Sequence, residues 1–189
     1  MRKIFVLLST LSLLFFFVNC PQEENKEPTA EEKASAKKSI AALNVAMQQA
    51  YTTGQSNAAP QNPMYTTTSY DINETLDASA WGGSGTITVT GTGSYDDETN
   101  KYSMTMTLKF NNYTYAGITI NGSCTLTSSG TDDTFSMTYN GSFKVTGEYN
   151  MSLSIKENIT FTGSTLSYSA TITVDGKTWT ESQTVNMSY

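Results

Sequence analysis

A segment near the middle of the chain alternates strictly between apolar and polar side chains. Every second residue from Tyr102 to Phe110 is apolar, and the residues between them are Ser, Thr or Lys. Because successive side chains of a strand point to opposite faces, this segment predicts a β-strand with one apolar and one hydroxylated face. Later segments repeat the alternation, so the pattern predicts a sheet that is buried on one side.

A second pattern recurs along the chain: an apolar residue, Thr, another apolar residue, Thr or Asn, and then Gly. It ends at Gly91, Gly122, Gly141 and Gly163. The alternation continues in phase through Gly122 and Gly141, so we expect glycines inside strands, where they usually mark a bulge or a bend. Glycines in neighbouring strands would let a sheet curl strongly.

The turns between strands are mostly local, and a wide loop is predicted from Asn111 to Gly117. The alternation from Phe135 to Ile155 is too long for one strand of a small domain. The dipeptide Asn140-Gly141 is a strong hairpin signal, but a turn near Gly147 leaves longer arms, and we favour it. Asp175-Gly176 predicts a two-residue hairpin between the last two strands.

These strands and turns predict a mainly β fold. We expect an antiparallel meander of about eight strands over residues 65–189, forming a strongly curved sheet or a small barrel. One helix is expected to pack against it.

The predicted helix covers residues 29–54. Thr29 and Glu32 have the spacing of a capping box, and Gly54 is well placed to end the helix. The helix carries one apolar stripe, formed by Ala36, Ile40, Leu43, Met47 and Tyr51. The following residues, 55–64, contain two prolines and no periodicity, and predict a loop.

The charge of the chain argues against some partners. Twelve acidic residues and five lysines follow Gly54. A domain of this sign repels phosphate backbones, so we expect no nucleic-acid partner. The domain also lacks the basic patch that docks proteins on anionic lipid.

The N-terminus has the features of an export signal. Met1-Arg2-Lys3 is basic, and the apolar run from Ile4 to Val18 is shorter than the ~20 residues that span a bilayer. The run ends at Phe17-Val18-Asn19-Cys20. This ending resembles the lipobox of bacterial lipoproteins, in which the Cys is acylated and becomes the first mature residue.

Two lipobox positions differ from the usual Leu and Ala or Gly. Phe17 and Asn19 occupy them, and this looser form resembles spirochaete-type lipoproteins. An ordinary secretory peptide with a chance Cys, or an uncleaved anchor helix, are the alternatives. The resemblance implies a signal peptide over residues 1–19 and acylation of Cys20. The charged segment after Cys20 has two prolines and no apolar residue, and predicts a flexible tether over residues 20–28. The resemblance also implies a lipid-anchored protein of the bacterial cell envelope, at the outer membrane or cell surface.

Few residues suggest catalysis. The chain has no histidine, which removes the commonest general base and the usual zinc ligand. Cys124 shares its predicted strand face with apolar residues and is expected to be a buried, inert thiol. The adjacent acids Asp96-Asp97-Glu98 and Asp132-Asp133 lack the spacing of a preformed calcium loop. We therefore predict no enzyme activity, no cofactor and no metal site.

Three functions remain after these exclusions. The leading interpretation is a non-enzymatic binding or envelope-surface module. The alternative is a carrier of a lipid or other apolar molecule on the concave face of the sheet, because Met suits adaptable apolar sites. Its candidate ligand face comprises Met104, Met106, Phe110, Met137, Tyr139 and Met151. These side chains equally suit a well-filled core. A hydrolase that uses turn carboxylates is the weakest interpretation.

A ladder of threonines marks the polar side of one predicted strand. It comprises Thr86, Thr88, Thr90 and Thr92. Its spacing is similar to the Thr arrays that order water on ice-binding proteins, but Thr is also the default solvent-facing residue of strands. We expect the second, ordinary role.

Overall fold

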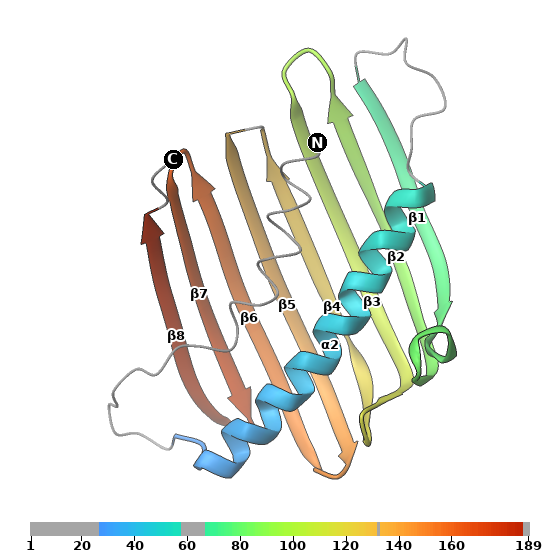
Figure 1. Cartoon of the computed structure of the whole chain (residues 1–189), viewed down its shortest axis with the longest axis vertical. Helices are drawn as coiled ribbons and strands as arrows, with labels where there is room; N and C mark the ends of the chain where they lie inside the picture. The colour runs from blue at the N-terminus through green and yellow to red at the C-terminus, as the bar shows by residue number, and fades with distance from the viewer. Residues whose placement is uncertain (1–26, 58–66, 132, 187–189) are drawn as a thin grey trace.

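The computed structural model describes residues 27–57, 67–131 and 133–186. It contains one long helix, one short 3-10 helix and eight strands in these ranges (Figure 1). The elements are α2 Ala30–Asn57, β1 Thr67–Asp77, η2 Ala78–Trp81, β2 Ser84–Asp96, β3 Lys101–Tyr115, β4 Ile118–Gly130, β5 Thr134–Gly147, β6 Met151–Thr162, β7 Thr165–Val174 and β8 Lys177–Asn186. The predicted signal peptide, Cys20 and most of the predicted tether lie outside the described residues.

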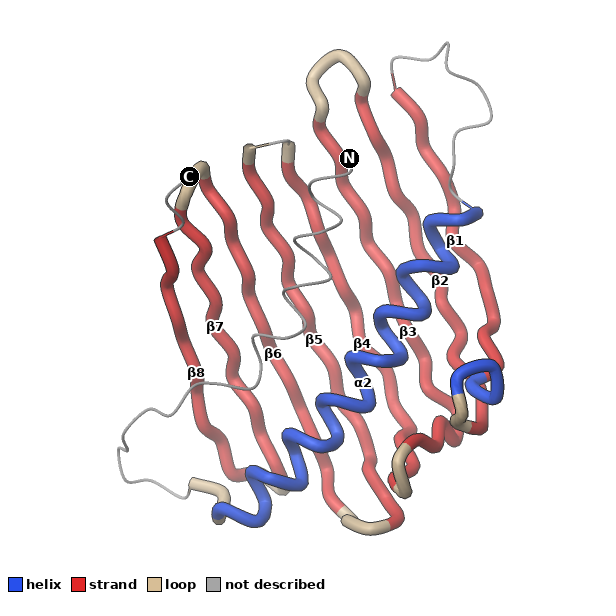
Figure 2. The backbone as a smooth tube through the Cα atoms, viewed as in Figure 1, coloured by secondary structure: helices blue, strands red, loops and turns tan. Residues whose placement is uncertain are grey.

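The strands form a single antiparallel sheet in the order of the sequence, from β1 to β8. The predicted meander of about eight strands is therefore confirmed. The sheet is open, because β1 and β8 are not paired with each other, and it curls only weakly (Figure 2). The prediction of a strongly curved sheet or a closed barrel was therefore wrong in its curvature.

The recurrent glycines do not all interrupt the sheet. Gly91, Gly122 and Gly141 lie inside strands, as predicted. The pairing register passes through Gly91 and Gly141 without a shift, whereas the register between β3 and β4 shifts beside Gly122. At another glycine, an aromatic side chain takes up the space on the face of the sheet. The ring of Tyr70 lies over Gly93, its direct cross-strand partner, at a place that a Cβ atom would occupy. A glycine covered by an aromatic ring keeps the sheet continuous rather than bending it.

Two turns follow the prediction. β5 ends at Gly147, as favoured over a turn at Asn140-Gly141. Asp175 and Gly176 join β7 to β8 with φ angles of 47° and 82°, as a type I′ hairpin requires. Gly163, which ends the fourth copy of the glycine pattern, lies in the β6–β7 turn.

The helix begins with the predicted capping box. The Thr29 N–H donates to Glu32 Oε2 at 2.7 Å, and the Glu32 N–H donates to Thr29 Oγ1 at 3.2 Å. The helix continues to Asn57, so it does not end at Gly54. Residues 55–57 of the predicted loop are thus helical, and 58–64 lie outside the described residues.

Helix α2 crosses one face of the sheet diagonally, from the β8 side to the β1 side (Figures 1 and 2). We call this face the core face. The helix contacts it mainly through small side chains, which are the buried residues Ser35, Ala36, Ser39, Ala42, Ala46 and Ala50, together with Ile40 and Leu43. Small residues let the helix backbone approach the sheet closely.

Polar contacts fix the direction of the helix. Lys177 of β8 pairs with Glu32 at 2.7 Å, near the start of α2. Two turns later, Lys38 pairs with Glu148 of the β5–β6 turn. These pairs are partly exposed, so each contributes little stability and serves mainly to orient the helix.

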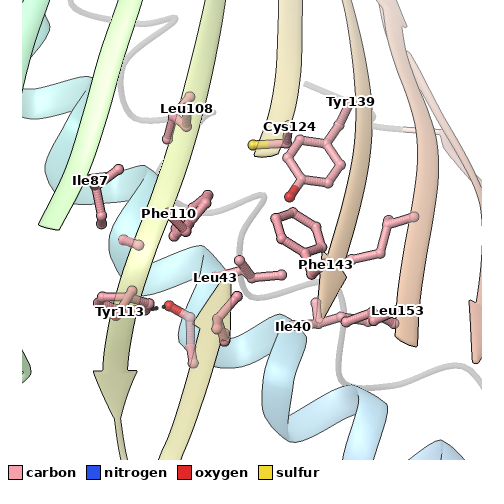
Figure 3. Close-up of a cluster of buried hydrophobic side chains, with 14 of the residues drawn as sticks. Ile40, Leu43, Ile87, Leu108, Phe110, Tyr113, Cys124, Tyr139, Phe143 and Leu153 are labelled. Atoms are coloured by element: carbon pink, nitrogen blue, oxygen red, sulfur yellow. Dashed lines mark hydrogen bonds between the residues drawn. The ribbon is translucent and has the colours of Figure 1, made fainter. Parts of the chain in front are cut away.

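One buried tyrosine joins the middle of the helix to the sheet. The Tyr113 hydroxyl donates to the Ala42 carbonyl oxygen at 3.2 Å (Figure 3). Tyr113 is fully buried, although the sequence suggested a wide loop from Asn111 to Gly117. β3 instead continues to Tyr115 through a register shift between Phe110 and Tyr113.

Close packing beneath α2 predicts that added volume is tolerated poorly there. Ala46→Leu places a larger side chain at a position with no exposure and should lower the free energy of unfolding by about 1–3 kcal/mol. Ala34→Leu, on the exposed side of the same helix, should change it by about 0.5 kcal/mol or less. Urea denaturation followed by tryptophan fluorescence measures both. Equal effects of the two substitutions would contradict this packing.

Candidate functional site

All six residues of the candidate ligand face lie on the core face of the sheet. Their side chains are buried, with Met137 partly so. Cross-strand pairing places them in different rows: Met104 and Met137 flank Ser128, and Met106 and Tyr139 flank Leu126. The residues therefore form a broad apolar surface over β3, β5 and β6 and not one compact cluster.

The part of this surface beneath α2 is filled by the protein's own side chains. Phe110 is 1% exposed, and its ring packs edge-on against Phe143 at a centroid distance of 5.6 Å (Figure 3). The Phe110 ring also contacts the ring of Tyr113, at a centroid distance of 5.8 Å. The Tyr113 hydroxyl is hydrogen-bonded to the helix. This packing matches the interpretation of these residues as a filled core.

One acidic side chain is buried in the core face. Glu157 is 4% exposed and lies directly opposite Tyr139 on β5. Its Oε1 atom has no hydrogen-bond partner among the described residues. Burial raises the pKa of Glu157 to about 8, so the carboxyl is protonated at neutral pH. The apolar alternation of β6 did not single out this position, because Glu157 interrupts it.

Cys124 is unreactive in this environment. It is 2% exposed and lies beside Tyr139 on the neighbouring strand (Figure 3). Burial raises the pKa of its thiol to about 11, which keeps it protonated at neutral pH. The prediction of a buried thiol is confirmed, and a thiolate nucleophile is disfavoured there.

One of the acids that were considered for calcium, Asp96, has a structural role. The Asp96 carboxylate accepts hydrogen bonds from the N–H groups of Glu98 and Thr99 at 2.9 and 3.1 Å. These bonds lower the pKa of Asp96 and close the β2–β3 turn. In the described ranges, no three His, Cys, Asp or Glu side chains lie close enough to hold a metal ion.

The opposite side of the sheet, which we call the outer face, carries only polar side chains across eight strands. Two complete cross-strand rows illustrate it: Asn73, Thr90, Thr107, Thr125, Asn140, Lys156, Thr171 and Thr180, and next to it Asp71, Thr92, Thr105, Thr127, Thr138, Asn158, Ser169 and Ser182. No described element covers this face (Figure 1).

The hydroxyl groups of the outer face bond to one another at its margins. Ser94 and Ser103 are 2.9 Å apart, and Thr173 and Thr178 are 2.8 Å apart. The side chains in the centre, such as Thr125, are exposed and can donate and accept hydrogen bonds. The Thr ladder of β2 is thus one column of a much wider hydroxylated surface. The sequence pattern predicts this column, but the width of the hydroxylated surface depends on the register between strands.

The described helices give no sign of a membrane span, because none is both long and apolar enough to cross a bilayer. The chain matches no protein-family model, no curated protein and no solved structure. The two faces of the sheet therefore provide the evidence on function.

The buried carboxyl of Glu157 predicts a stability that falls as pH rises. A glutamate in the unfolded chain has a pKa of about 4.3, so the folded protein holds one extra proton between pH 5 and 8. The free energy of unfolding should fall by about 1.4 kcal/mol per pH unit in this window. Glu157→Gln removes this titration and should flatten the slope.

Urea denaturation between pH 5 and 9 measures this effect. Glu98→Gln, in the exposed β2–β3 turn, is the matched control and should keep the slope of the natural protein. The groups with a lowered pKa, such as Asp96, titrate below this window. An unchanged slope in Glu157→Gln would show that Glu157 is not buried as a neutral acid.

Proposed function

We propose that this protein is a lipid-anchored, non-enzymatic binding module of the bacterial cell envelope, which contacts its partner through the outer face of the sheet. Acyl chains on Cys20 hold it to the outer membrane or cell surface, as the lipobox resemblance implies. Two or three acyl chains give stable anchoring, whereas a single chain binds only marginally.

The observation that carries this proposal is the distribution of charge between the surfaces of the sheet. Twelve acids follow Gly54, yet the strands β3 to β8 place no carboxylate on the described outer face. The acids of these strands, Glu157 and Glu181, belong to the core-face rows. Folding does not require the outer face of β3 to β8 to be free of acids, because exposed carboxylates cost little stability. The segregation therefore supports a binding role for this face.

The absence of catalytic groupings on the described outer face fits a binding role. Its side chains are hydroxyls, amides and lysines, apart from the acids of β1 and the strand ends. The chain has no histidine to act as a base toward the hydroxyls, and the Cys124 thiol is on the other face.

A carrier of an apolar ligand is the second candidate, and one observation favours it. The unpartnered Oε1 of Glu157 lies within the apolar core face, next to Tyr139. Buried polar groups normally have a partner, and an apolar molecule with a hydrogen-bonding head group would supply one. The filled packing around Phe110 weighs against a large ligand beneath the helix, so we place this function second.

Substitutions in the centre of the outer face test the leading proposal. Thr107 and Thr125 are exposed cross-strand partners, and replacing both with Glu adds two carboxylates without changing the core. The full chain, reconstituted in neutral liposomes, is applied to an array of purified glycans and matrix proteins. Binding of the natural protein should weaken by about tenfold or more, a loss of about 1.4 kcal/mol.

The control places the same two charges elsewhere. Asn150→Glu with Ser164→Glu changes exposed turns at the strand ends and should leave array binding unchanged. Absence of array binding by the natural protein, or an equal loss in both variants, would refute a binding role for the outer face.

A further inference from the structure

Three lysines of the outer face have no acidic neighbour. Lys109 lies between Thr88 and Ser123 on the adjacent strands, and all three positions belong to the outer face. Lys144 lies between Asn121 and Ser152.

The third lysine has the same surroundings. Lys156 lies between Asn140 and Thr171. All three lysine side chains are exposed. The ion pairs of the described residues use other lysines, namely Lys33, Lys38 and Lys177.

The three ammonium groups form a wide triangle on the sheet. Strand spacing and residue rise place Lys109 about 12 Å from Lys144, and Lys156 about 14 Å from Lys144. These separations exceed the Debye length of about 8 Å at physiological salt. Each lysine therefore acts as a separate positive charge within a field of neutral hydroxyls and amides.

The nearest acids lie at the margins of this surface. Asp175 is in the β7–β8 turn, where its Oδ1 accepts a hydrogen bond from the Ser152 N–H at 2.8 Å. Strand spacing places Asp175 about 10 Å from Lys144. Asp77, at the end of the edge strand β1, is about 12 Å from Lys109 by the same measure. Because both separations exceed the Debye length of about 8 Å, each lysine keeps a positive field around its own ammonium group although the domain is acidic.

Building on the binding role proposed above, we infer that this surface binds an anionic polysaccharide of the envelope in which the protein is anchored. Hydroxyls and amides that both donate and accept match the hydroxyl groups of sugars. The described outer face has no aromatic ring on which a sugar could stack, so charge must supply part of the affinity. Three widely spaced lysines fit carboxylates or phosphates that are separated by neutral sugars, and not a dense polyanion such as nucleic acid.

Binding to a sparsely charged polymer tests this inference. The full chain in neutral detergent micelles is applied to immobilised hyaluronan, which has one carboxylate per disaccharide, and to neutral dextran. We expect salt-sensitive binding to hyaluronan and none to dextran. Lys109→Gln with Lys144→Gln should weaken hyaluronan binding by about tenfold, because it removes two exposed charge contacts.

A second double variant removes the same charge from other places. Lys33 and Lys37 are both on helix α2, which lies on the core face and not on the outer face. Lys33→Gln with Lys37→Gln should keep the hyaluronan binding of the natural protein. Equal weakening in the two double variants, equal binding to dextran, or binding to anionic phospholipid vesicles in place of hyaluronan would overturn the inference.

The outcomes separate this inference from the proposed function. If array binding is lost in the Thr107 and Thr125 variant but retained without Lys109 and Lys144, the outer face binds a partner that is not an anionic polysaccharide. If the outer-face variants change nothing, both fail.

Discussion

An open sheet with one apolar face needs a cover, and within the described ranges α2 is the helix that covers it. A barrel would bury its interior by closing on itself, whereas here β1 and β8 remain apart. α2 must therefore bury the centre of the core face, and its small residues let it lie close to the strands. The hydrogen bond from the Tyr113 hydroxyl to the Ala42 carbonyl oxygen joins this helix to the sheet.

Because the helix covers one face, the other face is left to solvent, and the two faces carry different side chains. In the described sheet, the acids lie in the turns, on β1 and on the core face. Across β3 to β8, the outer face carries threonines, serines, asparagines and the three lysines without an acidic cross-strand partner. Thr is common on solvent-facing strands, so the hydroxyl groups alone are no evidence of a binding surface. The evidence is their combination with three lysines that have no acidic cross-strand partner, in a domain that is acidic overall.

Local patterns in the sequence predicted most of the fold. The alternation from Tyr102 to Phe110 identified β3, the Thr29 and Glu32 spacing identified the start of the helix, and Asp175-Gly176 identified the last hairpin. These features depend on neighbours within a few residues. Curvature does not: the recurrent glycines suggested a strong curl, but at one of them, Gly141, the ring of Phe143 fills the space that the missing side chain leaves.

The candidate site was less predictable, because it depends on register between strands. The core-face residues were found from the alternation of apolar side chains, but Glu157 was not, because it interrupts this alternation. Only the pairing of β6 with β5 shows that it lies opposite Tyr139. Likewise, the lysines at 109, 144 and 156 are far apart in sequence and share a surface only once the eight strands are aligned. Tyr113 was assigned to a loop because a register shift breaks the alternation there.

The central claim is that the core face is filled by the protein itself, so that partners bind outside it. Native mass spectrometry of the full chain, purified from membranes in detergent, tests this claim most directly. The account predicts the mass of residues 20–189 with acyl chains on Cys20, and no other adduct. A discrete apolar molecule that is released only on unfolding would contradict it and would make the core face the binding site.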